Sequence, residues 1–273
     1  MNTDKNNLRL AVLIDADNTF KVIDIIDELF EEISKFGDAS VRRIYGDWTQ
    51  NQLSRWKEVL PKHAIQPMQQ YANTKGKNST DSALIIDAMD LLYTAPLDGF
   101  CIVSSDSDFT RLAIRLRESG KAVYGFGERK TPESLRAACN KFIYIENLLP
   151  NKVMDASVIN SAQEVSKAIT ETKSSSTPAS EVSTLAPIVK KTSQELIANK
   201  KLIALIRSAI EIASDETGWA QLGGVGSSIE KQATDFDPRT YGFKKLSDLV
   251  SAIELFEVVK DNMRVLIREK VKK

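Results

Sequence analysis

Short apolar runs alternate with segments of helical periodicity between residue 8 and about residue 150. Six runs have the length and residue types of strands: Leu10–Asp15, Ser40–Tyr45, Ala64–Gln69, Gly99–Ser104, Ala122–Phe126 and Phe142–Ile145. Helices are predicted between them at Phe20–Phe36, Ser82–Leu92, Phe109–Glu118 and Glu133–Ala138. Alternation of this kind predicts an α/β layer fold with a mostly parallel sheet.

The pattern changes after residue 150. Residues 151–192 contain a Ser/Thr-rich stretch with prolines and no aromatic residue, which predicts a flexible linker. Helical periodicity returns in the last part of the chain, at Gln194–Ile212, Leu222–Ala233 and Lys244–Leu255. Two alternating strands then surround a polar turn within Phe256–Ile267, as in a β-hairpin. We therefore expect one domain over residues 1–150 and a small winged helix (α+β) over residues 193–273.

Composition narrows the function classes only slightly. The 273 residues have a net charge of zero, with 42% apolar and 27% charged residues, as in ordinary globular proteins. The two cysteines, Cys101 and Cys139, lie in apolar segments and are predicted to be buried free thiols of a reducing compartment. The polar amino terminus lacks a signal-peptide core, and no run of apolar residues could span a membrane. We expect a cytoplasmic protein without membrane contact.

Aspartates gather at the predicted strand ends of the first domain. Asp15 and Asp17 follow the first strand, Asp106 and Asp108 follow the fourth, and Asp81 lies at the start of a helix. Ligands collect at the carboxyl ends of strands in open parallel sheets. Gathered carboxylates repel one another unless a cation lies between them, and Mg²⁺ or Mn²⁺ prefers such oxygen ligands. The first hypothesis is therefore a metal-dependent phosphodiesterase.

Each acid also has a plain structural explanation. Asp81 suits the positive end of a helix dipole, and either Asp106 or Asp108 could cap the following helix. Two acids two residues apart are harder to explain without a cation. In two-metal sites the ions clamp the attacking and leaving oxygens of a phosphoryl displacement and activate water, which requires no histidine. The single histidine, His63, is predicted only to connect a helix to a strand.

Further residues around the acids are candidates for substrate contacts. Asn18 would add a neutral ligand or orient a phosphate. Lys75 and Lys77 could neutralise the substrate backbone, although a solvated loop explains them equally well. Asp17 and Asp47 are second-tier candidates.

These residues resemble a known family. The resemblance rests on four segments: Ile14–Asn18, Tyr45–Trp48, Lys77–Asp81 with Asp87 downstream, and Ser104–Phe109. Together they are similar to the NYN domain of the PIN-like nucleases, over about residues 8–147. The resemblance implies a Rossmann-like PIN-type fold and a Mg²⁺ or Mn²⁺ site that acts on RNA. Its catalytic, metal-binding residues would be Asp15, Asp81, Asp106 and Asp108.

The last part of the chain resembles a second family. Its segment Phe236–Leu246, with the central Tyr-Gly-Phe-Lys-Lys-Leu, is similar to the OST-HTH or LOTUS domain. Such domains are small winged helices linked to RNA binding, and some contact proteins instead. The candidate phosphate contacts are Lys231, Arg239, Lys244, Lys245, Lys260 and Arg264. Tyr241 or Trp219 would stack a base, unless Tyr241 simply packs in the core.

The function that we expect is a metal-dependent ribonuclease that carries a tethered winged helix and acts on single-stranded RNA. Two other functions are alternatives to it. A haloacid-dehalogenase-like phosphatase would use the Asp-x-Asp-x-Thr segment that ends at Thr19. It also requires an acidic pair farther along the chain, and the first domain has none beyond Asp108. A non-catalytic RNA-binding or regulatory module would have the same acids, because ligand acids and catalytic acids look alike in sequence.

Overall fold

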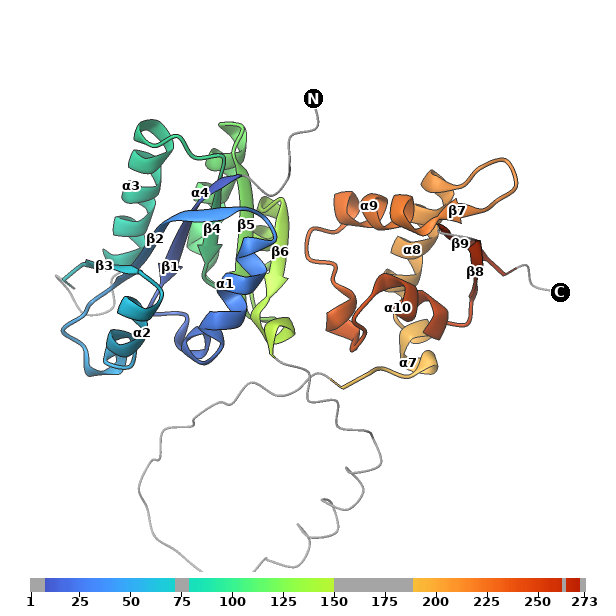
Figure 1. The fold of residues 1–273 in the computed structure, drawn as a ribbon, viewed down its shortest axis with the longest axis horizontal. Helices are drawn as coiled ribbons and strands as arrows, with labels where there is room; N and C mark the ends of the chain where they lie inside the picture. Colours follow the sequence, from blue (N-terminus) through green and yellow to red (C-terminus); the bar gives the residue numbers. More distant parts are fainter. Residues whose placement is uncertain (1–7, 72–78, 150–188, 262–263, 271–273) are drawn as a thin grey trace, which may run out of the picture.

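Two separate sheets organise the chain in this computed structural model (Figure 1). The first half forms a six-stranded sheet and the second half a three-stranded sheet. The structure describes residues 8–71, 79–149, 189–261 and 264–270. The predicted combination of an α/β domain and a small winged helix is confirmed. The predicted linker and the hairpin turn lie largely outside the described residues.

The larger sheet is entirely parallel, with strand order β3-β2-β1-β4-β5-β6. Its strands are β1 (Arg9–Asp15), β2 (Asp38–Gly46), β3 (Gln66–Gln69), β4 (Gly99–Val103), β5 (Ala122–Gly127) and β6 (Lys141–Tyr144). All six predicted strands are present, with bounds within two residues of the prediction. The central strands β1 and β4 are buried almost throughout because helices cover both faces. Ile14 pairs with Val103, so the two strands end side by side.

Two helical layers enclose this sheet. The elements between the strands are η2 (Phe20–Ile25), α1 (Ile26–Ser34), η3 (Asn51–Leu53), α2 (Trp56–Lys62), α3 (Ser79–Thr94), η4 (Ser107–Phe109), α4 (Thr110–Glu118), α5 (Glu133–Ala138) and η5 (Ile145–Leu148). The side chains of α1 and α2 pack with Val12 and Ile14, whereas those of α3, α4 and α5 pack with Ala11 and Leu13 on the other face. Alternate side chains of β1 therefore belong to two hydrophobic cores, one on each face of the sheet. The predicted Phe20–Phe36 helix is divided at Ile25, where φ is −130°.

The second domain packs four helices on its small sheet. Its elements are α7 (Ser193–Ala198), α8 (Lys200–Ala213), β7 (Ala220–Gln221), α9 (Leu222–Gln232), η6 (Pro238–Tyr241), α10 (Leu246–Ala252), β8 (Phe256–Asp261) and β9 (Arg264–Glu269). The predicted hairpin is confirmed by antiparallel pairing of β8 with β9. The single predicted helix Gln194–Ile212 is wrong. Asn199 leaves the helical conformation and instead caps α8, its side chain accepting from the Leu202 N–H at 3.1 Å.

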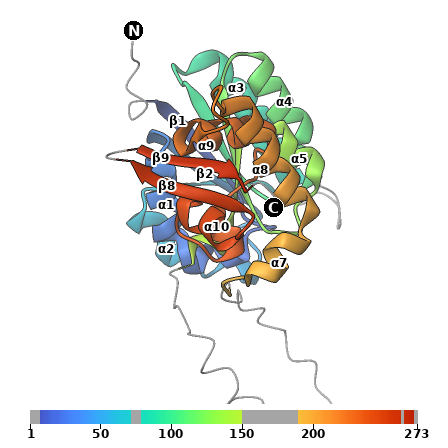
Figure 2. The ribbon, with the colours of Figure 1, turned by 90° about the vertical axis from the view of Figure 1, so that its right-hand side faces the viewer.

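The second domain lies beside the edge strand β6 of the first (Figure 1), and the view from its own side places α8 and α10 in front of the first domain (Figure 2). Each domain has its own apolar core. Cys101 and Cys139 are buried free thiols, as predicted. Among the described helices, none combines the length and apolar character that a bilayer crossing requires.

Candidate metal centre

Asp15 closes β1 in a fully buried position. Its Oδ2 accepts hydrogen bonds from the Ser104 hydroxyl at 2.7 Å and from the Asn18 amide at 2.8 Å. Its Oδ1 is also buried but has no hydrogen-bond partner among the described residues. Burial raises the pKa of Asp15 despite these two donors. A buried carboxylate oxygen without a donor is costly, and a bound cation would satisfy it.

Three further acids meet near the end of β4. Asp81 comes from the first turn of α3, and Asp106 and Asp108 flank the start of η4. One carboxylate oxygen from each lies within 4.8 Å of those from the other two. The exposure of the group is graded, with Asp81 buried, Asp106 intermediate and Asp108 exposed. The cluster is therefore open to solvent on one side, as a site for a polymeric substrate must be.

The local backbone explains why Asp106 holds its place. Its Oδ1 accepts a hydrogen bond of 2.9 Å from the Asp108 N–H, which caps η4. Its own N–H donates to the Ser104 hydroxyl at 3.1 Å. The same hydroxyl donates to Asp15, so Ser104 connects the acid of β1 to the turn after β4. Asp106 therefore caps a helix, as the sequence allows, and is also a member of the acidic cluster.

The electrostatics of the cluster are those of a site built for positive charge. Burial, and then the charges of Asp15, Asp106 and Asp108, raise the pKa of Asp81 to about 7. The negative charges of its neighbours thus disfavour the ionised form of Asp81. Every donor is a carboxylate oxygen, which suits Mg²⁺ or Mn²⁺ and not a soft metal. On these grounds the residues fit the divalent ion that the sequence predicts.

The second-tier acids are engaged by other groups. Burial raises the pKa of Asp17, and a hydrogen bond with Thr80 opposes that shift. The Asp47 carboxylate accepts hydrogen bonds from Thr49, Gln50 and Gln69. These donors hold its pKa well below the usual range. Asp47 therefore stabilises the turn after β2, and it is not one of the three acids of the cluster.

The predicted substrate contacts are spread over both domains. Lys75 and Lys77 lie outside the described residues. Asn18 is exposed, but its side-chain amide donates a hydrogen bond to Asp15. Lys244 and Lys245 are exposed before α10, and Lys245 lines a hollow of about 570 Å³ that Arg264 also borders. Tyr241 is half-buried against Phe236, at a centroid distance of 6.3 Å.

Two side chains near the site carry a role that sequence reasoning did not assign. In the sequence, Ser104 ends a predicted strand and opens the segment Ser104–Phe109, and Thr80 lies within the segment Lys77–Asp81, but neither is predicted to contact an acid. Their contacts with Asp15 and Asp17 depend on which strands and helices are neighbours. The sequence places Ser104 directly after an apolar strand. Because Ile14 pairs with Val103, that position lies beside Asp15 at the ends of β1 and β4.

Related proteins were found by sequence and by structure. An uncharacterized protein of Methanocaldococcus jannaschii is 27% identical over 126 residues, which are 45% of this chain and 49% of that protein. The chain thus spans about half the length of that curated relative. A Vibrio parahaemolyticus protein of unknown function is 18% identical, with a TM-score of 0.44 over 53% of this chain and 96% of its own. An uncharacterized Nitrosomonas europaea protein is 31% identical, with a TM-score of 0.25 over 38% of this chain and 95% of its own.

Family models match both domains in the predicted order. Residues 197–267 match the OST-HTH/LOTUS domain. Residues 9–146, about half of the chain, match the NYN domain. These residues contain the whole parallel sheet and all four acids described above. The protein therefore belongs to the NYN domain family and carries an OST-HTH/LOTUS domain as its second domain.

Proposed function

We propose that this protein is a metal-dependent ribonuclease that hydrolyses RNA phosphodiester bonds at the acidic site of its NYN domain. The observation that carries the proposal is the meeting of Asp81, Asp106 and Asp108 within 4.8 Å, beside the buried Asp15. Membership of a family within the PIN-like nucleases supports this chemistry, and the OST-HTH/LOTUS domain supports RNA as the substrate.

The four acids would hold one or two Mg²⁺ or Mn²⁺ ions. When bound, such an ion supplies positive charge for the phosphate oxygens and lowers the pKa of water toward neutrality. Asp15 is kept in place by Ser104 and Asn18, and Asp106 is kept in place by its cap on η4. The carboxylates of Asp15 and Asp106 are thus held in position before an ion binds, which lowers the free energy needed to order them during the reaction.

The exposed side of the cluster is where a strand of RNA would enter. Asp108 is the exposed member, and Asp81 and Asp15 form the buried side. The exposed Lys244 and Lys245 of the second domain would contact the phosphate backbone. Single-stranded RNA is the form that we expect, because its bases are free to stack on aromatic side chains. The buried free thiols support a reducing compartment such as the cytoplasm.

Cleavage of a labelled single-stranded RNA by the full-length protein tests the proposal. Mn²⁺ or Mg²⁺ should support cleavage, and EDTA should abolish it. Asp106→Asn should lose cleavage by about 100-fold or more while RNA binding is retained, because the amide keeps the η4 cap but not the negative charge. Asp90→Asn is the matched control, since Asp90 is an exposed acid of α3 outside the cluster.

The outcomes separate the competing functions. RNA binding without cleavage by the wild-type protein, in either metal, would favour a non-catalytic RNA-binding module. Metal-dependent release of phosphate from small esters through an aspartyl-phosphate would favour the phosphatase. Equal cleavage by Asp106→Asn and Asp90→Asn would remove the acidic cluster from the mechanism.

A further inference from the structure

The second domain covers part of the open edge of the parallel sheet. Strand β6 is the edge strand of the larger sheet in the described part of the chain, so its outer edge would otherwise carry unpaired backbone groups. The Phe142 N–H donates to the Thr234 carbonyl of the second domain at 2.9 Å. The Thr234 hydroxyl donates back to the Arg136 carbonyl at 2.8 Å. Thr234 therefore joins the two domains through both its backbone and its side chain.

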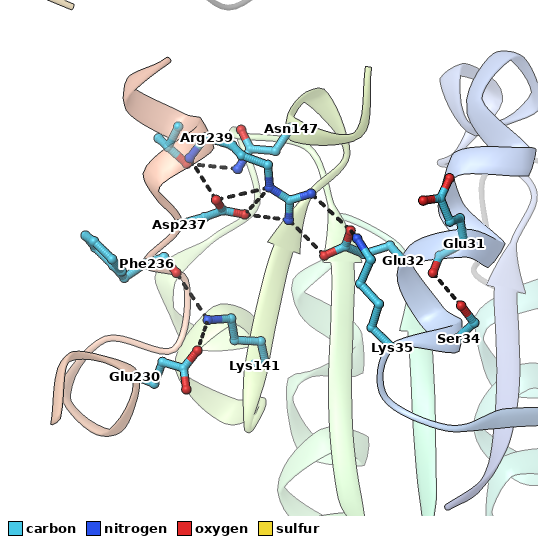
Figure 3. Close-up of polar contacts among 11 residues, drawn as sticks. Glu31, Glu32, Ser34, Lys35, Lys141, Asn147, Glu230, Phe236, Asp237 and Arg239 are labelled. Atoms are coloured by element: carbon cyan, nitrogen blue, oxygen red, sulfur yellow. Dashed lines mark hydrogen bonds and ion pairs between the residues drawn. The ribbon is translucent and has the colours of Figure 1, made fainter. Parts of the chain in front are cut away.

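A buried charge network lies at one end of this contact (Figure 3). The Arg239 guanidinium of the second domain meets the Glu32 carboxylate of α1 in a two-pronged pair, with N–O distances of 3.0 and 2.8 Å. Its Nε also donates to Asp237 at 2.9 Å. The side chains of Glu32 and Asp237 are only 8% and 9% exposed. Forked pairs between arginine and carboxylate depend strongly on orientation.

Two more ion pairs lie along β6. Arg136 of α5 pairs with Asp235, and the Tyr144 hydroxyl donates to the same carboxylate at 2.6 Å. Lys141 pairs with Glu230 of α9 at 3.1 Å. The first domain thus contributes the acid Glu32 and the bases Arg136 and Lys141, and each pairs with an oppositely charged side chain of the second domain.

We propose that the face formed by β6, α5 and the end of α1 is the docking surface for the OST-HTH/LOTUS domain of the same chain. The Arg239–Glu32 pair selects the docked orientation. A domain docked in another orientation would cover Glu32 without bringing Arg239 to it, and removing one partner from a mostly buried ion pair is strongly unfavourable. Asp237 belongs to the same domain as Arg239 and keeps that partner in any orientation. The second domain therefore works from one position on the first and is not a free tether.

Arg239 has a different role from the one that the sequence predicts. It is predicted as a phosphate contact, but in the docked protein its guanidinium pairs with the carboxylates of Glu32 and Asp237. The test can be independent of RNA and of metal, because the inference concerns only the arrangement of the two domains.

Zero-length carbodiimide crosslinking of the full-length protein provides that test. The reagent joins Lys141 to Glu230 only when the domains are docked, because the two side chains belong to different domains. The Lys21–Glu128 pair, at 2.6 Å within the first domain, reports the efficiency of the reaction. Peptide mass spectrometry measures both products in the same sample.

The key variant is Glu32→Arg, and its matched control is Glu31→Arg. Both place the same charge on adjacent positions of α1, but Glu31 is exposed and no dashed line joins its carboxylate to Arg239 in Figure 3. Glu31→Arg should crosslink like the wild type. Glu32→Arg should lose the Lys141–Glu230 product by about tenfold or more, because it sets a cation against the Arg239 guanidinium.

A second variant guards against misfolding as an explanation. Asp235→Arg opposes Arg136 from the second domain and should lose the same product, while circular dichroism and the Lys21–Glu128 product stay normal. Equal yields from Glu32→Arg and Glu31→Arg would overturn the role of the pair. Absence of the Lys141–Glu230 product in the wild type would overturn docking. Mixed products from isotope-labelled and unlabelled protein would show docking between two copies instead.

Discussion

The Ser104 hydroxyl donates a 2.7 Å hydrogen bond to Oδ2 of Asp15, across the ends of the neighbouring strands β1 and β4. The hydroxyl oxygen of Ser104 also accepts a hydrogen bond from the Asp106 N–H at 3.1 Å. One small side chain, fully buried, thus fixes two of the four acids relative to each other. Outer-shell partners of metal ligands commonly affect metal affinity or activity as strongly as 10–100-fold.

We therefore expect Ser104→Ala to reduce the rate of RNA cleavage by about tenfold and to raise the Mn²⁺ concentration needed for half-maximal rate. The reason is that Asp15 loses a donor and its carboxylate is less well oriented. Titration of cleavage against Mn²⁺ measures both effects. Ser107→Ala, at an exposed position of the same turn, should behave like the wild type. Identical metal titrations for the two variants would contradict the role of Ser104.

The charge on Asp81 should lower stability in the absence of metal. Its pKa is raised from 3.8 to about 7, by burial and then by neighbouring acids, so ionisation is less favourable in the folded than in the unfolded protein. The penalty is absent below the ordinary pKa and complete above the raised one. In EDTA at pH 8 we expect Asp81→Asn to be more stable than the wild type by about 1–2 kcal/mol, less than the full shift because solvent screens the site.

Urea unfolding at several pH values measures this difference. The advantage of Asp81→Asn should shrink as the pH falls from 8 through 7 and should vanish near pH 4. Asp90→Asn should follow the wild type at each pH. A constant advantage across the whole range would mean that the amide improves packing and that the carboxylate charge is not the cause.

Asp47 should matter for folding more than for the reaction. Its carboxylate accepts from Thr49, Gln50 and Gln69, which links the turn after β2 to β3. We expect Asp47→Ala to lower the melting temperature by the same amount with and without Mn²⁺. Cleavage per folded molecule should stay within a few-fold of the wild type. Loss of the Mn²⁺ requirement, or of cleavage in a well-folded variant, would make Asp47 part of the site.

Docking of the second domain should affect substrate binding more than the chemical step. This prediction rests on both the ribonuclease function and the docked arrangement. A domain held beside β6 raises the local concentration of bound RNA near the acids. Glu32→Arg should therefore raise the KM for a long single-stranded RNA several-fold, with kcat nearly unchanged, whereas Glu31→Arg should change neither. A fall in kcat with unchanged KM would indicate that docking acts on the acidic site itself.

Much of the architecture follows from local pattern. The strands β1 and β4 are short apolar runs, the first ending in Asp15 and the second followed by the turn that carries Asp106. The helix α5 has the bounds that its sequence predicts. The failures have local causes that compete with periodicity. Asn199 lies in a continuous apolar pattern, yet its side chain favours capping over continuation of the helix. The strand β7 is only two residues long and has no periodicity to detect.

Sequence alone determined the α/β fold, because the alternation of apolar runs with helical segments is readable along the chain. It also determined the choice of Asp15, Asp81, Asp106 and Asp108 as candidates, through the acids near strand ends and the resemblance to the NYN domain. Only the tertiary structure decided that Ser104 reaches Asp15, that other donors occupy Asp47, and that Arg239 meets Glu32. These contacts depend on strand order and on how two surfaces face each other. Glu32 and Arg239 are 207 residues apart, and no local signal links side chains at such a separation.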